Sequence, residues 1–127
     1  MASYGVTIQM MQQINLTHNI SFHGSPLPGE VWGWGIRTMH LIHFVTHGQG
    51  RFEIPGKSFS LSAGQAFYIE PNQLVRYSSS ADNPITYWWV EWFGEGSDAL
   101  VKAMGFDREH PVMTFRNSAE VLAAMDS

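Results

Sequence analysis

Six histidines are the side chains of this 127-residue sequence that could hold a metal ion. A strand presents two histidines to one ion when they stand two apart, because alternate side chains share a face. His40 and His43 stand three apart and face opposite ways, and neither His-x-His nor His-Glu-x-x-His occurs. Convergence of histidines distant in the sequence is the alternative. We expect no metal and no cofactor, with His43 as a hydrogen-bonding pocket or core residue. The histidines expected on the surface or in loops are His18, His23, His47 and His110.

Residues for catalysis also lack a recognisable arrangement. General acid–base chemistry needs two titratable groups in distinct environments, and nothing in the sequence pairs Glu53, Glu70 or Glu91. The chain has no cysteine and no Gly-x-Ser-x-Gly sequence, which removes two common kinds of nucleophile. No catalytic residue is predicted, and we expect that the protein is not an enzyme.

A binding site has better support, from the strand expected over residues 85–93. Tyr87, Trp89 and Glu91 alternate along it and therefore share one face. An aromatic plane suits the C–H face of a sugar ring, and a carboxylate accepts hydrogen bonds from paired hydroxyls, so this face suits a saccharide. The alternative is that the two rings belong to the core and that Glu91 pairs with Arg37.

The strand expected over residues 39–46 supplies a second wall. Its period of two places Arg37, Leu41 and His43 on one face, while Ile42 and Phe44 lie on the other. Arg37 could donate to ring or hydroxyl oxygens of a sugar, and Leu41 and His43 would line the same wall. Both faces are largely apolar, which predicts a strand covered on both sides.

These strands belong to a larger pattern of short strands and tight turns between Leu41 and Tyr77. Turns are expected at residues 47–50, 55–57, 62–64 and 71–72, where glycine, proline and asparagine favour turn geometry. Short strands at nearly regular spacing, rich in Phe, Ile, Tyr and Val, indicate an antiparallel barrel or sandwich. The fold class we expect is therefore mostly β, with residues 19–94 forming the barrel.

Residues 31–37 should form a strand interrupted by glycine. Glycine within a strand lets another group approach the backbone, so the sequence Trp32-Gly33-Trp34-Gly35 could frame a pocket mouth, with Trp34 as a binding residue. A barrel corner that needs glycine to bend is the alternative.

The two ends of the chain have different patterns. Residues 1–18 show no strict period and are expected to form an arm or a strand. Over residues 95–127 the period becomes helical, with Ser97 as the N-cap of a first helix that Gly105 follows. A second helix, beginning at Asn117 or Ser118, reaches the last residue without a C-cap, which suggests a fragment of a longer protein or an end set by proteolysis.

Composition narrows the class of protein. The net charge is −4 with only seven Lys and Arg, which argues against nucleic-acid binding by this segment alone. Hydrophobic residues make up 44% of the chain, enough for the core of one domain. No apolar run reaches the roughly 18 residues of a membrane span, and no signal peptide is recognisable. A cytoplasmic protein without membrane contact is expected.

A set of segments within residues 20–115 carries a family resemblance. They are Arg37, Leu41-Ile42-His43-Phe44-Val45-Thr46-His47-Gly48-Gln49-Gly50, Gly56-Lys57, Leu61, Gly64-Gln65-Ala66-Phe67-Tyr68-Ile69, Pro71, Tyr77 and Asn83-Pro84-Ile85-Thr86-Tyr87-Trp88-Trp89-Val90-Glu91-Trp92-Phe93-Gly94. Together they resemble the N-terminal effector-binding domain of AraC-type transcription regulators. The likeness is greatest to the branch that controls raffinose, melibiose and multiple-sugar utilisation in Gram-positive bacteria.

The resemblance implies a cupin-type β-barrel, a jelly roll, followed by helices used for dimerisation. The family's DNA-binding part is a C-terminal helix-turn-helix domain, which is absent from this chain. The implied partner is a small sugar effector, such as an α-galactoside, and the implied assembly is a homodimer. Metal-dependent cupins carry a His-x-His and a later His after a Pro-x-Gly turn, and this sequence departs from both, so a metal-free barrel is implied.

The resemblance also implies binding residues. Tyr77 matches a sugar-contacting position of the family, and Tyr87 and Trp89 match two more if the loop before them is one residue shorter. Arg37 is the nearest counterpart of the family's arginine, although it is out of register. With the residues chosen from strand faces, the predicted site is Arg37, Leu41, His43, Tyr77, Tyr87, Trp89, Glu91 and Trp34.

Three hypotheses follow for the function of the chain. The first is the sugar-sensing and dimerisation domain of an AraC-family regulator of carbohydrate utilisation. The second is a small cupin enzyme, an isomerase or dioxygenase acting on a small polar substrate. The third is a barrel that serves only for dimerisation and binds no ligand.

Overall fold

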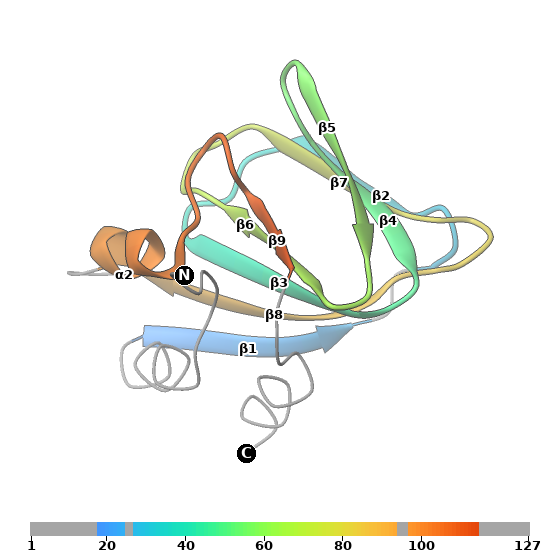
Figure 1. Cartoon of the computed structure of the whole chain (residues 1–127), viewed down its shortest axis with the longest axis horizontal. Helices are drawn as coiled ribbons and strands as arrows, with labels where there is room; N and C mark the ends of the chain where they lie inside the picture. The colour runs from blue at the N-terminus through green and yellow to red at the C-terminus, as the bar shows by residue number, and fades with distance from the viewer. Residues whose placement is uncertain (1–17, 25–26, 94–96, 115–127) are drawn as a thin grey trace.

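Two antiparallel sheets form the body of the protein (Figure 1). The computed structural model describes residues 18–24, 27–93 and 97–114. The five-stranded sheet has the order β1-β8-β3-β6-β9, and the four-stranded sheet has the order β2-β7-β4-β5. The elements are β1 (His18–Gly24), β2 (Val31–Gly35), β3 (His40–His47), β4 (Gln49–Ile54), β5 (Lys57–Ser62), β6 (Gln65–Ile69), β7 (Val75–Ser79), β8 (Thr86–Phe93), α2 (Ser97–Met104) and β9 (Val112–Thr114). The mostly β fold predicted from the strand spacing is confirmed.

The turns between these strands lie where the sequence places them. Gly48, Gly56 and Gly64 have φ values of +79°, +81° and +90°, and Asn72 has a φ of +64°. Left-handed backbone is strained for residues that carry a Cβ, and asparagine tolerates it better than most. At Gly48 a Cβ would also stand 2.0 Å from the carbonyl oxygen of Pro84, so this turn is packed against the loop before β8.

An inner core fills the space between the two sheets. It takes the inward-facing side chains of every second residue along the strands, as the alternation on β3 and β8 predicts. Its fully or nearly buried members are Leu41, Val45, Phe52, Ile54, Leu61, Phe67, Ile69, Val75, Tyr77 and Ile85, with Trp32, Phe59, Tyr87, Trp89 and Val112 partly buried against them.

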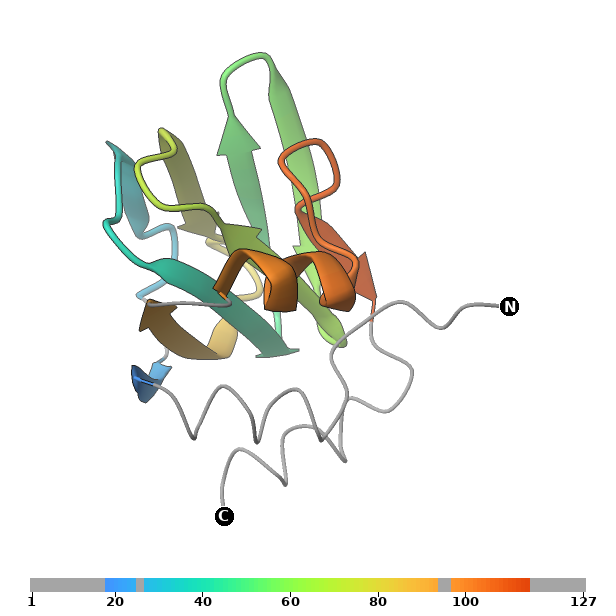
Figure 2. The same cartoon turned by 90° about the vertical axis from the view of Figure 1, so that its left-hand side faces the viewer.

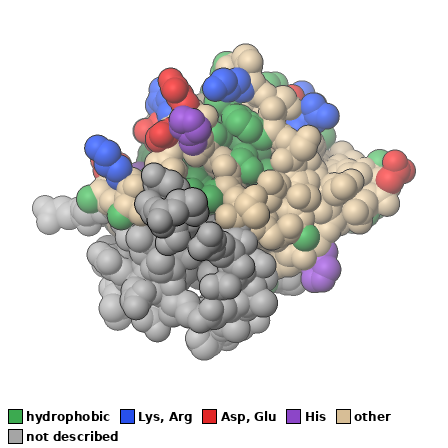
Figure 3. Space-filling model, viewed as in Figure 1, with side chains coloured by type: hydrophobic (Ala, Val, Ile, Leu, Met, Phe, Trp, Pro, Cys, Tyr) green, Lys and Arg blue, Asp and Glu red, His purple; other side chains and the backbone are tan. Residues whose placement is uncertain are grey.

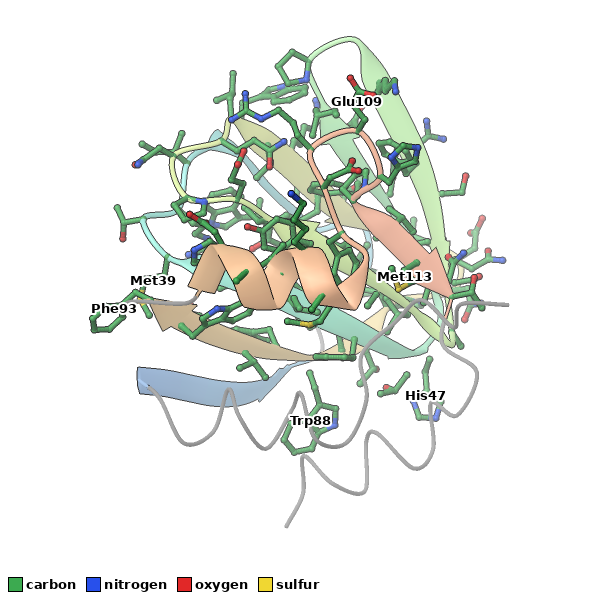
Figure 4. All side chains as sticks on the ribbon, turned by 60° about the vertical axis from the view of Figure 1, so that its left-hand side comes forward. Met39, His47, Trp88, Phe93, Glu109 and Met113 are labelled. Carbon is green, nitrogen blue, oxygen red and sulfur yellow. The ribbon has the colours of Figure 1, made fainter. Side chains whose placement is uncertain are left out.

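An outer core lies on the other face of the five-stranded sheet, under α2 (Figure 2). Val101 and Met104 of the helix pack with Ile42 and Phe44 of β3. The remaining buried members are Ala66, Tyr68, Val90, Trp92 and Phe106. Met113 of β9 packs at the edge of this cluster, close to the end of α2 (Figure 4). The prediction that β3 is covered on both faces is therefore confirmed.

The segment after the barrel differs in part from the helical pattern expected over residues 95–127. The first helix begins at Ser97 as predicted, and Gly105 follows it with a φ of +95°. Residues 112–114 then form β9, which pairs with β6 and extends the five-stranded sheet. Only three residues long, β9 shows no period from which it could be recognised. The expected second helix and the arm over residues 1–17 lie outside the described residues.

β2 is the irregular strand of the four-stranded sheet. It pairs with β7 alone within the described residues, and the register shifts between Gly33 and Gly35. A bulge of this kind leaves one residue without a partner and re-aims its side chain. Trp32 stays opposite Tyr77, facing inward, whereas Trp34 lies at the bulge and is 45% exposed.

Candidate ligand site between the sheets

A buried histidine surrounded by aromatic rings occupies the space between the sheets. His43, on β3, is 2% exposed and stacks in parallel on Phe67 with ring centroids 4.4 Å apart. Tyr77 and Tyr87 approach the imidazole at 4.9 Å and 4.7 Å, and Trp89 at 5.8 Å. These rings come from β3, β6 and β8 of one sheet and β7 of the other, and together they surround the imidazole.

The imidazole of His43 is uncharged and has unused hydrogen-bonding capacity. Burial holds its pKa well below the ordinary value, and the nearby Arg37 guanidinium lowers that pKa further. A neutral imidazole offers one donor and one acceptor, yet Nδ1 of His43 is buried without a hydrogen-bond partner. A buried nitrogen that makes no hydrogen bond destabilises the folded state unless a further molecule pairs with it.

Arg37 lies above the same cluster and links two of its rings. One of its terminal nitrogens donates a hydrogen bond of 2.8 Å to the Tyr77 hydroxyl, and its guanidinium carbon lies 4.0 Å from the ring centroid of Trp32. Trp32 in turn stacks on Tyr77, with centroids 5.1 Å apart and planes 18° apart. Burial raises the pKa of Tyr77, and the hydrogen bond from Arg37 opposes that rise, so the phenol stays protonated and can donate as well as accept.

Glu91 adds a carboxylate on the inward side of β8. It lies opposite Leu41 in the sheet, and its negative charge contributes to the raised pKa of Tyr77. No ion pair joins it to Arg37, although both residues are described. The alternative in which Glu91 pairs with Arg37 is therefore not the arrangement found here.

A small hollow remains between these rings and the start of β2. The space that the centre of a water molecule can occupy there is about 10 Å³, which is room for about one water. Burial raises the pKa of Tyr87, and the charges of Tyr77 and Glu30 raise it further. The hollow is lined by Glu30, Trp32, Leu61, Phe67, Tyr77, Ser78, Ser79, Ile85 and Tyr87.

Two wider grooves lie elsewhere on the four-stranded sheet. One, of about 590 Å³, is lined by Gln49, Gly50, Arg51, Ser60, Leu61, Ser62, Gln65, Ser78, Ser79 and Ser80 and has no aromatic ring. The other, of about 310 Å³, lies between Trp34 and the turn that joins β4 to β5. Both are open to solvent. The interior hollow is smaller, but buried aromatic rings line it, and one of them, Tyr77, contacts both His43 and Arg37.

The structure brings most of the predicted site residues together. Those on inward faces around the cluster are Arg37, Leu41, His43, Tyr77, Tyr87, Trp89 and Glu91. Of these, Tyr77 and Tyr87 line the hollow, whereas Arg37, Leu41, His43, Trp89 and Glu91 do not. Trp34 is separated from the others, because the bulge in β2 places it in the outer groove.

Seven residues that line the hollow are not in the predicted site, and three of them carry rings or charge: Phe67, Trp32 and Glu30. Phe67 is the ring on which His43 stacks, and its place follows from the pairing of β3 with β6. Trp32 and Glu30 border the hollow from the β2 side. Trp32 stood in the glycine-interrupted strand expected at a pocket mouth, but the alternation of that strand did not distinguish it from Trp34.

A second buried histidine belongs to the outer core. His40 is 6% exposed, its Nδ1 lies 2.7 Å from the Tyr68 hydroxyl, and its Nε2 lies 3.5 Å from a carboxylate oxygen of Asp98 at the start of α2. Burial lowers the pKa of His40, while the charges of Asp98 and Glu70 raise it. His40 thus fixes the first turn of α2 to the sheet, a contact that strand alternation alone does not predict.

The other histidines whose side chains are described lie outside the two cores. His47 and His110 are exposed, as expected, whereas His18 and His23 lie on β1, whose side chains are not described. Within residues 18–24, 27–93 and 97–114, no group of three or more His, Asp or Glu side chains is arranged to hold a metal ion. No helix in that part of the chain is long and apolar enough to cross a membrane.

Comparison with known families identifies the domain. A family model described as the AraC-like ligand binding domain matches residues 20–126. The chain belongs to this family. The resemblance drawn from the sequence segments is thereby confirmed, and the jelly roll described above is the scaffold of an AraC-like ligand binding domain.

Two relatives of this AraC-like domain are operon regulators. The lactose operon transcription activator of Staphylococcus xylosus is 33% identical over 69 residues, which cover 54% of this chain and 25% of the relative. The Msm operon regulatory protein of Streptococcus mutans is 24% identical over 90 residues, which cover 69% of this chain and 32% of the relative. The chain therefore spans about a quarter to a third of the length of these relatives.

Solved structures with a similar fold include a cupin barrel and an enzyme. A Cupin 2 conserved barrel domain protein from Salinispora arenicola superimposes with a TM-score of 0.55 at 17% identity, covering 66% of this chain and 71% of that one. The polyketide cyclase RemF from Streptomyces resistomycificus gives a TM-score of 0.54 at 12% identity, covering 59% and 54%. These likenesses establish the cupin fold of the domain.

Proposed function

We propose that this domain binds a neutral saccharide between its two sheets and acts as the effector-binding domain of a regulator of carbohydrate utilisation. The observation that carries the proposal is the buried cluster of Tyr77, Tyr87 and Trp89 around the unpaired nitrogen of His43. Membership of the AraC-like ligand binding domains and the likeness to two regulators of operons, one of them for lactose, support the same function.

The chemistry of the cluster suits a sugar. A pyranose has an apolar C–H face that packs on aromatic planes, and its hydroxyls both donate and accept hydrogen bonds. Trp89 and Tyr87 supply the planes, the tyrosine hydroxyls and His43 supply neutral polar atoms, and Arg37 supplies donors. An α-galactoside is the sugar we would test first.

The charge of the cluster favours an uncharged ligand over a sugar phosphate. Arg37 is the cation at the site, and it already contacts Tyr77 and Trp32. His43 stays neutral because its pKa is held low. The carboxylate of Glu91 acts on Tyr77 and that of Glu30 acts on Tyr87, so a phosphate bound between the two tyrosines would face two negative charges and one positive charge.

Ligand binding would reach the outside of the barrel through strands shared by both cores. His43 faces the inner cluster, while its neighbours Ile42 and Phe44 face the outer core under α2. A ligand that favours one position of β3 would also favour one packing of α2, which is a population shift between two states of the domain. In the full-length regulator, which we propose to be a cytoplasmic homodimer that binds DNA through a helix-turn-helix domain beyond this chain, that shift would alter the dimer.

The alternative is an enzyme on the same scaffold, since a polyketide cyclase shares the fold. We propose that this domain is not an enzyme, because it belongs to a family of ligand-binding domains and both operon regulators are relatives. Elemental analysis of the purified protein addresses the question, since stoichiometric iron, manganese or zinc would favour the enzyme.

The first test is a thermal-shift and calorimetric panel of raffinose, melibiose, lactose and galactose 6-phosphate. A ligand that binds only the native state stabilises it by roughly 2.7 kcal/mol at a concentration one hundred times its Kd. We expect a neutral saccharide to raise the Tm and the phosphate not to do so. If no sugar raises the Tm and none binds by calorimetry, the proposed function is wrong.

Trp89→Ala should lower the affinity by up to about tenfold, because it deletes an aromatic plane of the inner cluster and ring stacking contributes roughly 0.5–1.5 kcal/mol beyond the buried area. The matched control is Trp88→Ala, which truncates the next residue of β8 on the opposite face, against the outer core. Isothermal titration should show weak binding for the first variant and near wild-type binding for the second. Equal affinities for the two variants would remove Trp89 from the site.

A further inference from the structure

Trp32 fills the part of the interior that a sugar ring would need. Its indole stacks on Tyr77 and contacts the Arg37 guanidinium, the two groups best suited to hold a hydroxylated ring. It also forms a wall of the hollow, which has room for about one water. A saccharide cannot enter this space while the indole stays where it is.

The Trp32 indole packs against the backbone of its own strand at Gly35. A Cβ built on Gly35 would stand 3.1 to 3.5 Å from three atoms of the Trp32 ring, so the ring lies directly against this glycine. The indole thus folds back along its own strand and covers Gly35, Tyr77 and Arg37 at once. A side chain at position 35 would have to displace the ring by a few tenths of an ångström.

Trp32 is also the ring whose strand has the fewest pairing partners. β2 is an edge strand with a shifted register, and it pairs with β7 alone within the described residues. The strands that carry His43, Phe67, Tyr77 and Tyr87 each have partners on both sides. Edge segments with few neighbours open at lower free energy than central strands, so a ring on β2 can leave the interior more easily than the others.

We propose that the Trp32 side chain occupies the site in the unliganded domain and that a neutral saccharide takes its place against Tyr77 and Arg37. This inference rests on the proposed function, and it adds a competing group inside the chain to the site. The apparent affinity is then the intrinsic affinity reduced by the fraction of molecules in which the indole has moved out. Trp32 acts on binding by exclusion, unlike Trp89, which contacts the ligand.

Trp32→Ala should therefore bind the sugar more tightly than the wild type, by about tenfold or more, because the competing ring is gone. Isothermal titration with melibiose and with raffinose measures the change. The matched control is Ile36→Ala, which truncates an apolar side chain that is 53% exposed, one residue beyond β2. That variant should bind like the wild type.

Gly35→Ala gives a second test that keeps every aromatic ring. The new Cβ would lie very close to the Trp32 indole. The position of the indole inside the site therefore becomes less favourable, and the sugar should bind several-fold more tightly. In the double variant Trp32→Ala with Gly35→Ala, the second substitution should have no further effect, since no ring is left to displace. The single variant Gly35→Ala gives its result whether or not Trp32→Ala folds.

The outcomes separate this inference from the proposed function. If the wild type binds no neutral sugar and neither Trp32→Ala nor Gly35→Ala gains binding, both are wrong. If the wild type binds and Trp32→Ala binds equally or more weakly, the sensor function stands and the exclusion role of Trp32 is overturned. If the wild type binds and both variants bind more tightly, the inference is supported.

Solvent exposure of the indole provides an independent readout. Sugar should make the fluorescence of Trp32 more accessible to acrylamide, as measured by the difference between the wild type and Trp32→Phe. A decrease in accessibility on binding would mean that the ring closes over the ligand and would contradict the exchange.

Discussion

At the scale of single residues, the centre of the domain depends on an uncharged histidine. His43 stacks on Phe67 and is buried at 2% exposure, so protonation would place a charge among aromatic rings beside Arg37. The folded domain therefore disfavours the proton that the unfolded chain accepts at mildly acid pH. Its nitrogen is kept neutral and available to a ligand at neutral pH.

Stability should consequently fall as the pH falls below the ordinary histidine pKa of about 6.5. In that range the unfolded chain binds a proton at His43 and the folded chain does not, so the free energy of unfolding decreases by up to roughly 1.4 kcal/mol per pH unit for this residue. Denaturant unfolding at pH 7.5, 6.5 and 5.5 should show a shallower pH dependence for His43→Gln than for the wild type. His40, whose pKa is also lowered, is present in both proteins and cancels in the comparison. Identical slopes would contradict the neutral imidazole.

At the scale of elements, the turn between β3 and β4 fixes the position of β8. Gly48 and Gly56 have nearly the same left-handed φ, but they differ in their surroundings. A Cβ at Gly48 would collide with the backbone of Pro84 and Asn83, whereas one at Gly56 would meet nothing within 4 Å. The loop that leads into β8 therefore packs directly against the turn between β3 and β4.

Gly48→Ala should thus be far more destabilising than Gly56→Ala. Both variants carry the strain of left-handed backbone, roughly 1–2 kcal/mol, and only the first must also move the loop before Tyr87. Chemical denaturation of the two variants beside the wild type measures the difference. Gly56→Ala is the control for backbone strain, so equal losses would show that the contact with Pro84 has no energetic weight.

At the scale of the whole molecule, charge is spread rather than concentrated. Seven Lys and Arg stand against eleven Asp and Glu, and Figure 3 shows the two kinds interspersed on the face in view. Two of the basic groups form ion pairs with nearby carboxylates, Arg76 with Glu53 and Arg108 with Glu70. A nucleic acid is bound by clustered basic side chains that replace its counterions.

This domain alone should therefore not bind duplex DNA, even at low salt. A mobility-shift titration in about 50 mM salt should give no complex in the range of roughly 10⁻⁴ to 10⁻⁶ M that non-specific DNA-binding proteins reach. The natural comparison is the full-length protein on the same duplex. A shift by the isolated domain would mean that operator contact is not confined to another part of the regulator.

The sequence predicts those features of the fold that follow from the alternation of side chains along a strand. The inward set on β3 and β8, including His43, Tyr87 and Trp89, follows from a period of two, and the turns follow from glycine and proline. The contact of Trp32 with Tyr77 joins residues far apart in the chain through strand pairing, which no local pattern specifies. The bulge that sends Trp34 outward and the short strand β9 likewise depend on tertiary pairing. The volume left in the interior depends on how the rings pack, which a sequence does not contain.

The two-sided character of β3 has a consequence for how such domains diversify. Odd-numbered positions from 41 to 45 contribute to the inner core, and positions 42 and 44 contribute to the core beneath α2. Substitutions in one register therefore leave the contacts of the other register largely in place. We therefore expect that substitutions at positions 41, 43 and 45 can change the proposed ligand site while the contacts of positions 42 and 44 beneath α2 are kept.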